Sequence, residues 1–179
     1  MFNLMTQKNS QSLSDNFGRN LTDLRISLTD QCNFRCSYCM PKEIFGKDYQ
    51  FLPKKELLSF EEIKFLSNAF VNLGVEKLRL TGGEPLLRKN IPELIYDLKK
   101  LKTLKGDTVE VTLTTNGYLL QQFTSSLKKS GLDRVTISLD ALDENIFQEM
   151  IGGKYSPKIV LSGIDAAVNE GLSVKVNMV

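Results

Sequence analysis

Histidine is absent from this sequence, and cysteine occurs only three times in 179 residues. Without histidine the chain has no imidazole metal ligand, no Ser/His/Asp triad and no Cys/His nucleophile pair. It also has no apolar run near the roughly 18 residues that a membrane-spanning helix needs. Residues 1–15 are polar and lack the hydrophobic stretch of a signal peptide. We therefore expect a cytoplasmic protein with no membrane partner.

An excess of charge of one sign is missing as well. The chain has 23 lysine and arginine residues against 21 aspartate and glutamate residues, for a net charge of +2. This near balance of charges does not predict a polyanion-binding surface, so nucleic acid is not an expected partner. A chain of 179 residues, 41% hydrophobic, can bury the core of one domain. It is shorter than the roughly 250 residues of a full (β/α)₈ barrel.

Apolar runs of strand length alternate with segments of helical periodicity, an order that predicts an α/β fold with a parallel sheet. Strands are expected at 24–28, 77–80, 109–113, 134–139 and 173–179, and helices at about 59–73, 91–98, 119–129 and 157–170. Ser59 and Glu62 form the capping box of the first helix. A final parallel strand without a covering helix would leave a bare edge, so we expect a partial parallel (β/α) barrel, truncated after about five strands.

All three cysteines, Cys32, Cys36 and Cys39, lie within eight positions in the loop after the first expected strand. Three thiolates this close in sequence can hold three corners of one iron–sulfur cube. A fourth protein ligand is missing, so one iron is expected to stay open for an exogenous ligand. A structural zinc site and three incidental thiols are the alternatives. Zinc would require a fourth cysteine or a histidine nearby, and the chain has neither.

A second motif, Thr81-Gly82-Gly83-Glu84-Pro85, directly follows the second expected strand. Glycines allow a backbone to approach a ligand closely because they have no Cβ. Nearby carbonyls and the Glu84 carboxylate are expected to bind an ammonium group. An ordinary strand-to-helix turn is the alternative interpretation of the glycine pair.

The Cys-x3-Cys-x2-Cys spacing, with Tyr38 just before the last cysteine, and the Gly-Gly-Glu-Pro motif together resemble the radical S-adenosylmethionine (radical SAM) superfamily. The resemblance implies a [4Fe-4S] cluster on Cys32, Cys36 and Cys39, whose open iron takes the amino and carboxylate groups of S-adenosylmethionine. One electron from the cluster would then cleave this cofactor to methionine and a 5′-deoxyadenosyl radical.

Residues 16–179 further resemble the GTP 3′,8-cyclase family of molybdenum cofactor biosynthesis, most clearly at 17–19, 23–30 and 38–41. The resemblance implies the first step of that pathway, the conversion of GTP to (8S)-3′,8-cyclo-7,8-dihydroguanosine 5′-triphosphate. It also implies S-adenosylmethionine contacts at Tyr38, Gly83 and Ser138, and GTP contacts at Arg25, Lys77, Arg79, Thr114 and Lys175.

Independently of the family, inward-pointing cations near the carboxyl ends of barrel strands need an anionic partner, for which a triphosphate is suitable. The alternative for each cation is a solvated or salt-bridged surface position. For Thr114 and Ser138 the alternative is a capping or turn role.

The resemblance implies a flexible lead over residues 1–15 and a radical SAM core domain over 16–179. This core is expected to be incomplete, because full-length members continue with a C-terminal region that binds a second [4Fe-4S] cluster, whose cysteines are absent here. It further implies a reducing electron donor such as flavodoxin or ferredoxin, and it allows a homodimer. Two alternatives stay open: another radical SAM enzyme such as a peptide-modifying maturase, and a non-catalytic module that binds a [4Fe-4S] cluster or S-adenosylmethionine.

Overall fold

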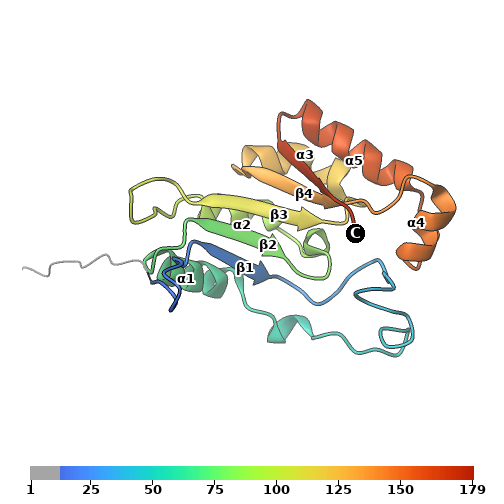
Figure 1. The fold of residues 1–179 in the computed structure, drawn as a ribbon, viewed down its shortest axis with the longest axis horizontal. Helices are drawn as coiled ribbons and strands as arrows, with labels where there is room; N and C mark the ends of the chain where they lie inside the picture. The colour runs from blue at the N-terminus through green and yellow to red at the C-terminus, as the bar shows by residue number, and fades with distance from the viewer. Residues whose placement is uncertain (1–12) are drawn as a thin grey trace, which may run out of the picture.

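The computed structural model describes residues 13–179, which form one parallel sheet of five strands in the order β1-β2-β3-β4-β5 (Figure 1). The strands are β1 (Asp23–Ser27), β2 (Lys77–Thr81), β3 (Glu110–Thr115), β4 (Arg134–Ser138) and β5 (Ser173–Asn177). All five expected strands are present, within a few residues of the predicted bounds. A parallel sheet whose strands follow the sequence order is part of a (β/α) barrel, which confirms the predicted fold class.

Helices connect the strands and cover one face of the sheet (Figure 1). They are α1 (Phe60–Val71), α2 (Ile91–Leu98), α3 (Leu120–Lys129), α4 (Glu144–Met150) and α5 (Pro157–Asn169), with 3-10 turns η1 (Lys54–Glu56) and η2 (Pro85–Leu87). The predicted capping box is confirmed, because Ser59 Oγ accepts the Glu62 N–H at 3.1 Å and the Glu62 carboxylate accepts the Ser59 N–H at 2.7 Å.

Helix α4 was not predicted. Its seven residues are too few to display a clear helical period. The available signal was its N-cap, because Asp143 accepts the N–H groups of Asn145 and Ile146, both at 3.0 Å. An aspartate in this position is among the preferred N-cap residues.

The core lies between the sheet and the helices, where alternate strand residues point inward. The inward side chains of the three central strands have no exposed surface: Leu78, Leu80, Val111, Leu113, Val135 and Ile137. Each such side chain contributes about 1.5–3 kcal/mol relative to an exposed position. A shift of one residue in the pairing would put the polar alternates into this core, so burial sets the strand register.

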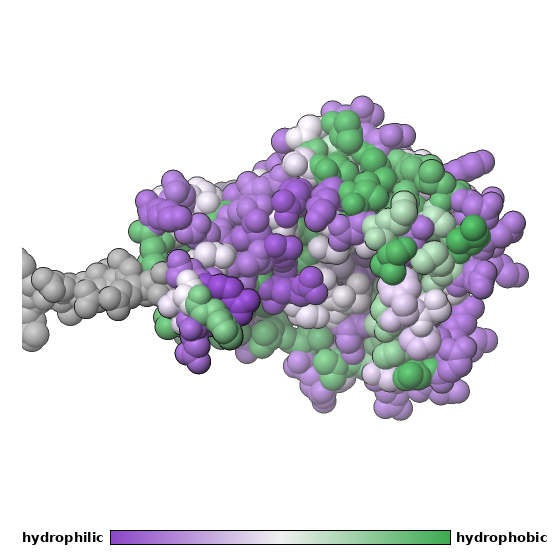
Figure 2. All heavy atoms as spheres, viewed as in Figure 1, coloured by the Kyte–Doolittle hydropathy of each residue, from purple (hydrophilic) through white to green (hydrophobic). Residues whose placement is uncertain are grey.

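The opposite face of the sheet carries the polar alternates and is open toward the viewer in Figures 1 and 2. We call it the polar face. The strand register arranges its side chains in lateral rows: Asp23, Lys77 and Glu110; then Arg25, Arg79, Thr112, Arg134 and Ser173; then Ser27, Thr81, Thr114, Thr136 and Lys175; and last Ser138 and Asn177. Figure 2 shows hydrophilic side chains along the middle of this face.

The predicted flexible lead over residues 1–15 lies, for residues 1–12, outside the described residues. The last residues of that segment contact the domain: the Leu13 N–H donates to the Leu73 carbonyl at 3.1 Å, and Ser14 forms an isolated antiparallel bridge with Asn20. Among residues 13–179, no helix combines the length and apolar character needed to cross a membrane.

Candidate functional site

The three cysteines lie in the loop between β1 and α1, beyond the carboxyl end of the sheet (Figure 1). All three are free thiols; Cys32 and Cys36 are partly buried and Cys39 is exposed. Burial, and then the negative charges of Cys39 and Cys32, raises the pKa of Cys36 to about 12. The charges of the three cysteines act on one another, although residues 13–179 contain no group of three such side chains already arranged to hold a metal ion. A bound metal cluster would remove the charge penalty on Cys36, since coordination deprotonates a thiol.

Two N–H groups point at the sulfur of Cys32. The Phe34 N–H lies 3.4 Å from Cys32 Sγ, and Asn116 Nδ2 lies 3.8 Å from it. Burial is the main cause that raises the pKa of this thiol, and both donors act in the opposite direction. They would stabilise a ligating thiolate. Asn116, in the turn after β3, was not predicted as a site residue; its position after a strand beside the predicted Thr114 was the only available signal.

An aromatic cluster anchors the cysteine loop to the body of the domain. Phe34, between the first two cysteines, is 3% exposed. Its ring stacks on Tyr155 at 5.2 Å between centroids and meets Phe147 and Tyr118 edge-on at 6.2 and 6.3 Å. Such pairs each contribute about 0.5–1.5 kcal/mol beyond their burial. The aromatic cluster therefore holds the loop even without a ligand.

Arg35 and the end of α4 hold the same loop by hydrogen bonds. The Arg35 guanidinium donates to the carbonyls of Phe45, Cys32 and Phe34, each at 2.7 Å. The Arg35 backbone N–H donates to the Ile151 carbonyl at 2.9 Å. These contacts leave the backbone of the loop little freedom to shift.

The glycines of the Gly-Gly-Glu-Pro motif pack against the start of the cysteine loop. A Cβ on Gly82 would lie 2.5 Å from the Thr29 carbonyl oxygen, and one on Gly83 would lie 2.3 Å from the Gln31 carbonyl oxygen. The Gly83 N–H donates to Thr29 O, and the Glu84 N–H to Gln31 O, both at 2.7 Å. The close approach that requires glycine here is thus to the protein's own backbone.

The expectation that the Glu84 carboxylate binds an ammonium group is wrong. Glu84 is 0% exposed. Its carboxylate accepts hydrogen bonds from Leu86 N at 3.0 Å, Thr115 Oγ1 at 2.8 Å and Asn116 N at 2.8 Å. Burial raises the pKa of this carboxyl, while the three donors act in the opposite direction. A buried carboxylate needs hydrogen-bond donors, and Glu84 finds them in both turns. Glu84 therefore links the turn after β2 to the turn after β3.

The residues expected to contact S-adenosylmethionine gather around the carboxyl end of the sheet. Gly83 follows β2, and Ser138 is the last residue of β4. Tyr38 reaches the loop after β4, where its hydroxyl donates to Asp140 Oδ2 at 2.7 Å. Burial and then this hydrogen bond raise the pKa of Tyr38. Asp140 is thus a further residue of this region.

The five residues expected to contact GTP, namely Arg25, Lys77, Arg79, Thr114 and Lys175, all lie on the polar face. Their expected position near the carboxyl ends of the strands is wrong for Lys77, which is the first residue of β2. Arg25, Arg79 and Lys175 are central strand residues. Their distance from the strand ends depends on where each strand begins and ends, and no sequence motif indicates those bounds.

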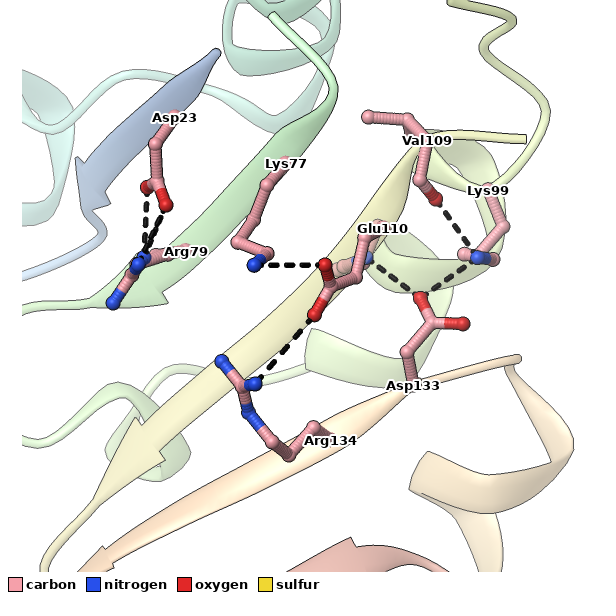
Figure 3. A network of polar contacts seen from close by, with 9 residues as sticks. Asp23, Lys77, Arg79, Lys99, Val109, Glu110, Asp133 and Arg134 are labelled. Carbon is pink, nitrogen blue, oxygen red and sulfur yellow. Dashed lines mark hydrogen bonds and ion pairs between the residues drawn. The ribbon is translucent and has the colours of Figure 1, made fainter. Parts of the chain in front are cut away.

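Carboxylates of the same face already contact two of these cations (Figure 3). Arg79 donates three hydrogen bonds of 2.6–2.8 Å to Asp23, which raise the pKa of Arg79. Lys77 Nζ lies 2.9 Å from Glu110 Oε2, and Arg134 Nη1 lies 3.8 Å from Glu110 Oε1. Sequence reasoning missed Asp23, Glu110 and Arg134 as members of this region.

Comparison with known proteins agrees with this geometry. The family model described as "Radical SAM superfamily" matches residues 26–179. The chain belongs to the radical SAM superfamily. It is 50% identical over 167 residues to a "GTP 3′,8-cyclase" of Staphylococcus epidermidis, which covers 93% of this chain and 48% of that protein. The corresponding protein of Staphylococcus saprophyticus is 47% identical over 169 residues, with 94% and 48% covered. The chain thus spans about half the length of the curated relatives it matches.

Solved structures of radical SAM enzymes share the fold. HydG, a maturase of the [FeFe]-hydrogenase, superposes with a TM-score of 0.69 at 18% identity, over 88% of this chain and 35% of HydG. Streptococcus suis SuiB bound to S-adenosylmethionine gives 0.68 at 21% identity, over 87% and 33%. These likenesses confirm the partial radical SAM barrel. Superfamily membership and the cofactor-bound neighbour support a [4Fe-4S] cluster and S-adenosylmethionine as cofactors of this radical SAM chain.

Proposed function

We propose that this chain provides the cluster site, the cofactor site and most of the phosphate site of a GTP 3′,8-cyclase. The reaction converts GTP to (8S)-3′,8-cyclo-7,8-dihydroguanosine 5′-triphosphate, the first step of molybdenum cofactor biosynthesis. One observation carries the proposal: the cations Arg25, Lys77, Arg79 and Lys175 share one face of the sheet, and the loop that holds the three cysteines follows the carboxyl end of β1 in the same sheet. The cyclase relatives support the same substrate.

Cys32, Cys36 and Cys39 would hold the [4Fe-4S] cluster, because they are the three free thiols of one anchored loop. The cluster and S-adenosylmethionine, when bound, supply a 5′-deoxyadenosyl radical that takes a hydrogen atom from the substrate. The N–H donors of Phe34 and Asn116 would stabilise the Cys32 thiolate. The chain itself contributes binding, orientation and charge.

Tyr38, Gly83 and Ser138 would contact S-adenosylmethionine from three sides of the carboxyl edge. The Tyr38–Asp140 hydrogen bond fixes the aromatic ring next to the last cysteine. The packing of Gly83 against Gln31 fixes the turn after β2 relative to the cysteine loop. A cofactor bound between these segments would meet preorganised groups.

The charges of the polar face suit a triphosphate. Arg25 and Lys175 make no ion pair with any residue in the range 13–179. Lys77 and Arg79 contact carboxylates that a more highly charged anion would outcompete. Thr114, in the row of Lys175, would donate its hydroxyl to the nucleotide. Arginine forks bind phosphate oxygens in pairs, which orients the ligand.

Transfer of a deuterium label tests the reaction. The reconstituted chain is incubated anaerobically with dithionite, S-adenosylmethionine and GTP deuterated at ribose C3′, and 5′-deoxyadenosine and cyclised nucleotide are quantified. Deuterium in 5′-deoxyadenosine supports the cyclase. Unlabelled 5′-deoxyadenosine, unaffected by GTP, would contradict it and favour a different radical SAM substrate such as a peptide. No 5′-deoxyadenosine at full cluster loading would favour a non-catalytic binding module.

Other parts of the proposal concern the cellular setting. Reduced flavodoxin or ferredoxin is the proposed electron donor, and the protein is proposed to act in the cytoplasm, with a homodimer allowed. The second [4Fe-4S] cluster belongs to the proposal for the longer family members, since all three cysteines of this chain lie in one loop. Guanine placement would depend on that second site.

A further inference from the structure

Three arginines occupy one lateral row of the polar face. The strand register pairs Arg25 with Arg79, Arg79 with Thr112, and Thr112 with Arg134. These residues alternate with core residues, so the three arginine side chains leave the sheet on the same side. Like charges on neighbouring positions of a sheet face repel one another unless they are compensated.

Two of these arginines, Arg79 and Arg134, are compensated very unequally (Figure 3). Arg79 makes three short hydrogen bonds to Asp23. Arg134 contacts Glu110 at 3.8 Å, beyond hydrogen-bond distance, and the other oxygen of Glu110 is occupied by Lys77 at 2.9 Å. The Glu110 carboxylate therefore contacts two cations, and it interacts more strongly with Lys77, which lies closer.

The guanidinium of Arg134 keeps unused donors. Its Nε is buried and has no hydrogen-bond partner among residues 13–179. Buried side-chain donors are normally paired, and a guanidinium offers five N–H groups in a planar fork. A water molecule could accept from Nε, but it would leave the surplus positive charge uncompensated. An oxyanion would satisfy both the donor and the charge.

We propose that Arg134 is a direct ligand of the substrate's phosphate groups, a fifth cation beside Arg25, Lys77, Arg79 and Lys175. The inference rests on the proposed nucleotide substrate. Glu110 holds Arg134 and Lys77 near the sheet until phosphate oxygens replace it as their partner. Phosphate is the matching chemistry because its oxygens accept from the arginine fork in pairs.

The charge count of the face predicts a preference among phosphates. Two carboxylates, Asp23 and Glu110, face five cations, so three positive charges stay uncompensated. A triphosphate carries enough negative charge to use all of them, whereas a monophosphate does not. Affinity is therefore expected to rise from GMP through GDP to GTP, with Arg134 contributing most to the last of these.

Calorimetric titration of the 179-residue chain with tripolyphosphate and with GTP tests the role of Arg134. Arg134→Gln is expected to weaken the binding of both about tenfold. Arg134→Lys keeps the charge but loses the fork, so an intermediate loss is expected. Glu110→Gln removes the competing carboxylate and should tighten tripolyphosphate binding severalfold. Lys129→Gln, an exposed cation in the last turn of α3, is the matched control for net charge.

The outcomes separate this inference from the proposed function. If Arg79→Gln weakens tripolyphosphate binding and Arg134→Gln does not, the role of Arg134 is refuted and the nucleotide site stands. If the parent chain binds neither GTP nor tripolyphosphate, the role of Arg134 and the proposed nucleotide site are both refuted. Should Arg134→Gln fail to fold, Arg134→Lys and Glu110→Gln decide: parent-like affinity in both overturns the inference, and the predicted opposite changes support it.

Discussion

The hydroxyl of Tyr38 donates a hydrogen bond to Asp140 Oδ2 at 2.7 Å and thereby joins two loops that are 102 residues apart in the sequence. The Asp140 carboxylate also accepts the Val179 N–H, at 3.2 Å through Oδ1. Both loops leave the carboxyl end of the sheet, one carrying the cysteines and the other following β4. The contact therefore closes one side of the proposed cofactor site.

Removal of this hydroxyl should loosen the cofactor site without removing the cluster. We expect Tyr38→Phe to weaken S-adenosylmethionine binding about threefold, a modest effect because the Tyr38 side chain is half exposed. Cluster absorbance should not change. The control is Tyr49→Phe, since the Tyr49 ring packs on Phe45 and Phe51. Unchanged cofactor affinity in Tyr38→Phe would show that the contact has no positioning role.

Glu84 should contribute to stability more than to cofactor affinity. Glu84→Ala leaves the N–H groups of Leu86 and Asn116 and the hydroxyl of Thr115 without their acceptor, and we expect a loss of about 3 kcal/mol in the free energy of unfolding. Urea denaturation of the variant and of Glu170→Ala, an exposed position at the end of α5, measures it. Equal stability of the two variants would contradict this account of Glu84.

Gly152 should be required for the docking of the cysteine loop. Its φ is +60°, and a Cβ there would lie 2.2 Å from the Arg35 carbonyl oxygen. Gly152→Ala is therefore expected to lower both the iron content after reconstitution and the melting temperature. Gly106→Ala separates strain from clash, because Gly106 has a φ of +86° and nothing within 4 Å of the added atom. If both variants lose iron equally, steric docking on Arg35 is not the cause.

The cysteine assignment has a direct spectroscopic test. Cys36→Ala should abolish the visible absorbance of a reconstituted [4Fe-4S] cluster, because two thiolates rarely retain a cube. Iron and sulfide analysis of the anaerobic protein measures the loss. A full complement of four irons in the variant would refute Cys36 as a ligand.

Asn116 should tune the reduction potential of the cluster. Its Nδ2 points at Cys32 Sγ, and N–H groups directed at ligating sulfurs stabilise the more negative, reduced state. Asn116→Ala is therefore expected to lower the potential in a redox titration followed by electron paramagnetic resonance. Asn33→Ala removes only the 2.8 Å contact between Asn33 and Asn116 and should change the potential less. A larger shift in Asn33→Ala would contradict the assignment.

The sequence alone was sufficient for the five strands, for four of the five α-helices and for the cysteine motif. Apolar runs of strand length at 77–80 and 134–139 predicted strands, and three cysteines within eight positions predicted one metal cluster because they lie in one loop. Both signals come from residues that are close in sequence, so they can be recognised without knowledge of the fold. The short helix α4 escaped because seven residues give too little periodicity.

Long-range pairing was decided only by the tertiary structure. Asp23 and Arg79 are 56 residues apart, and their bidentate contact exists because burial of the opposite face sets the register of β1 against β2. The same register brings Arg134 into the row of Arg25 and Arg79. The direction of the Glu84 carboxylate likewise depends on where the turn after β3 lies. A sequence motif can identify a residue as important, but it does not identify the residue's contact partner. The partners are set by the crossover helices, which bring distant strands together.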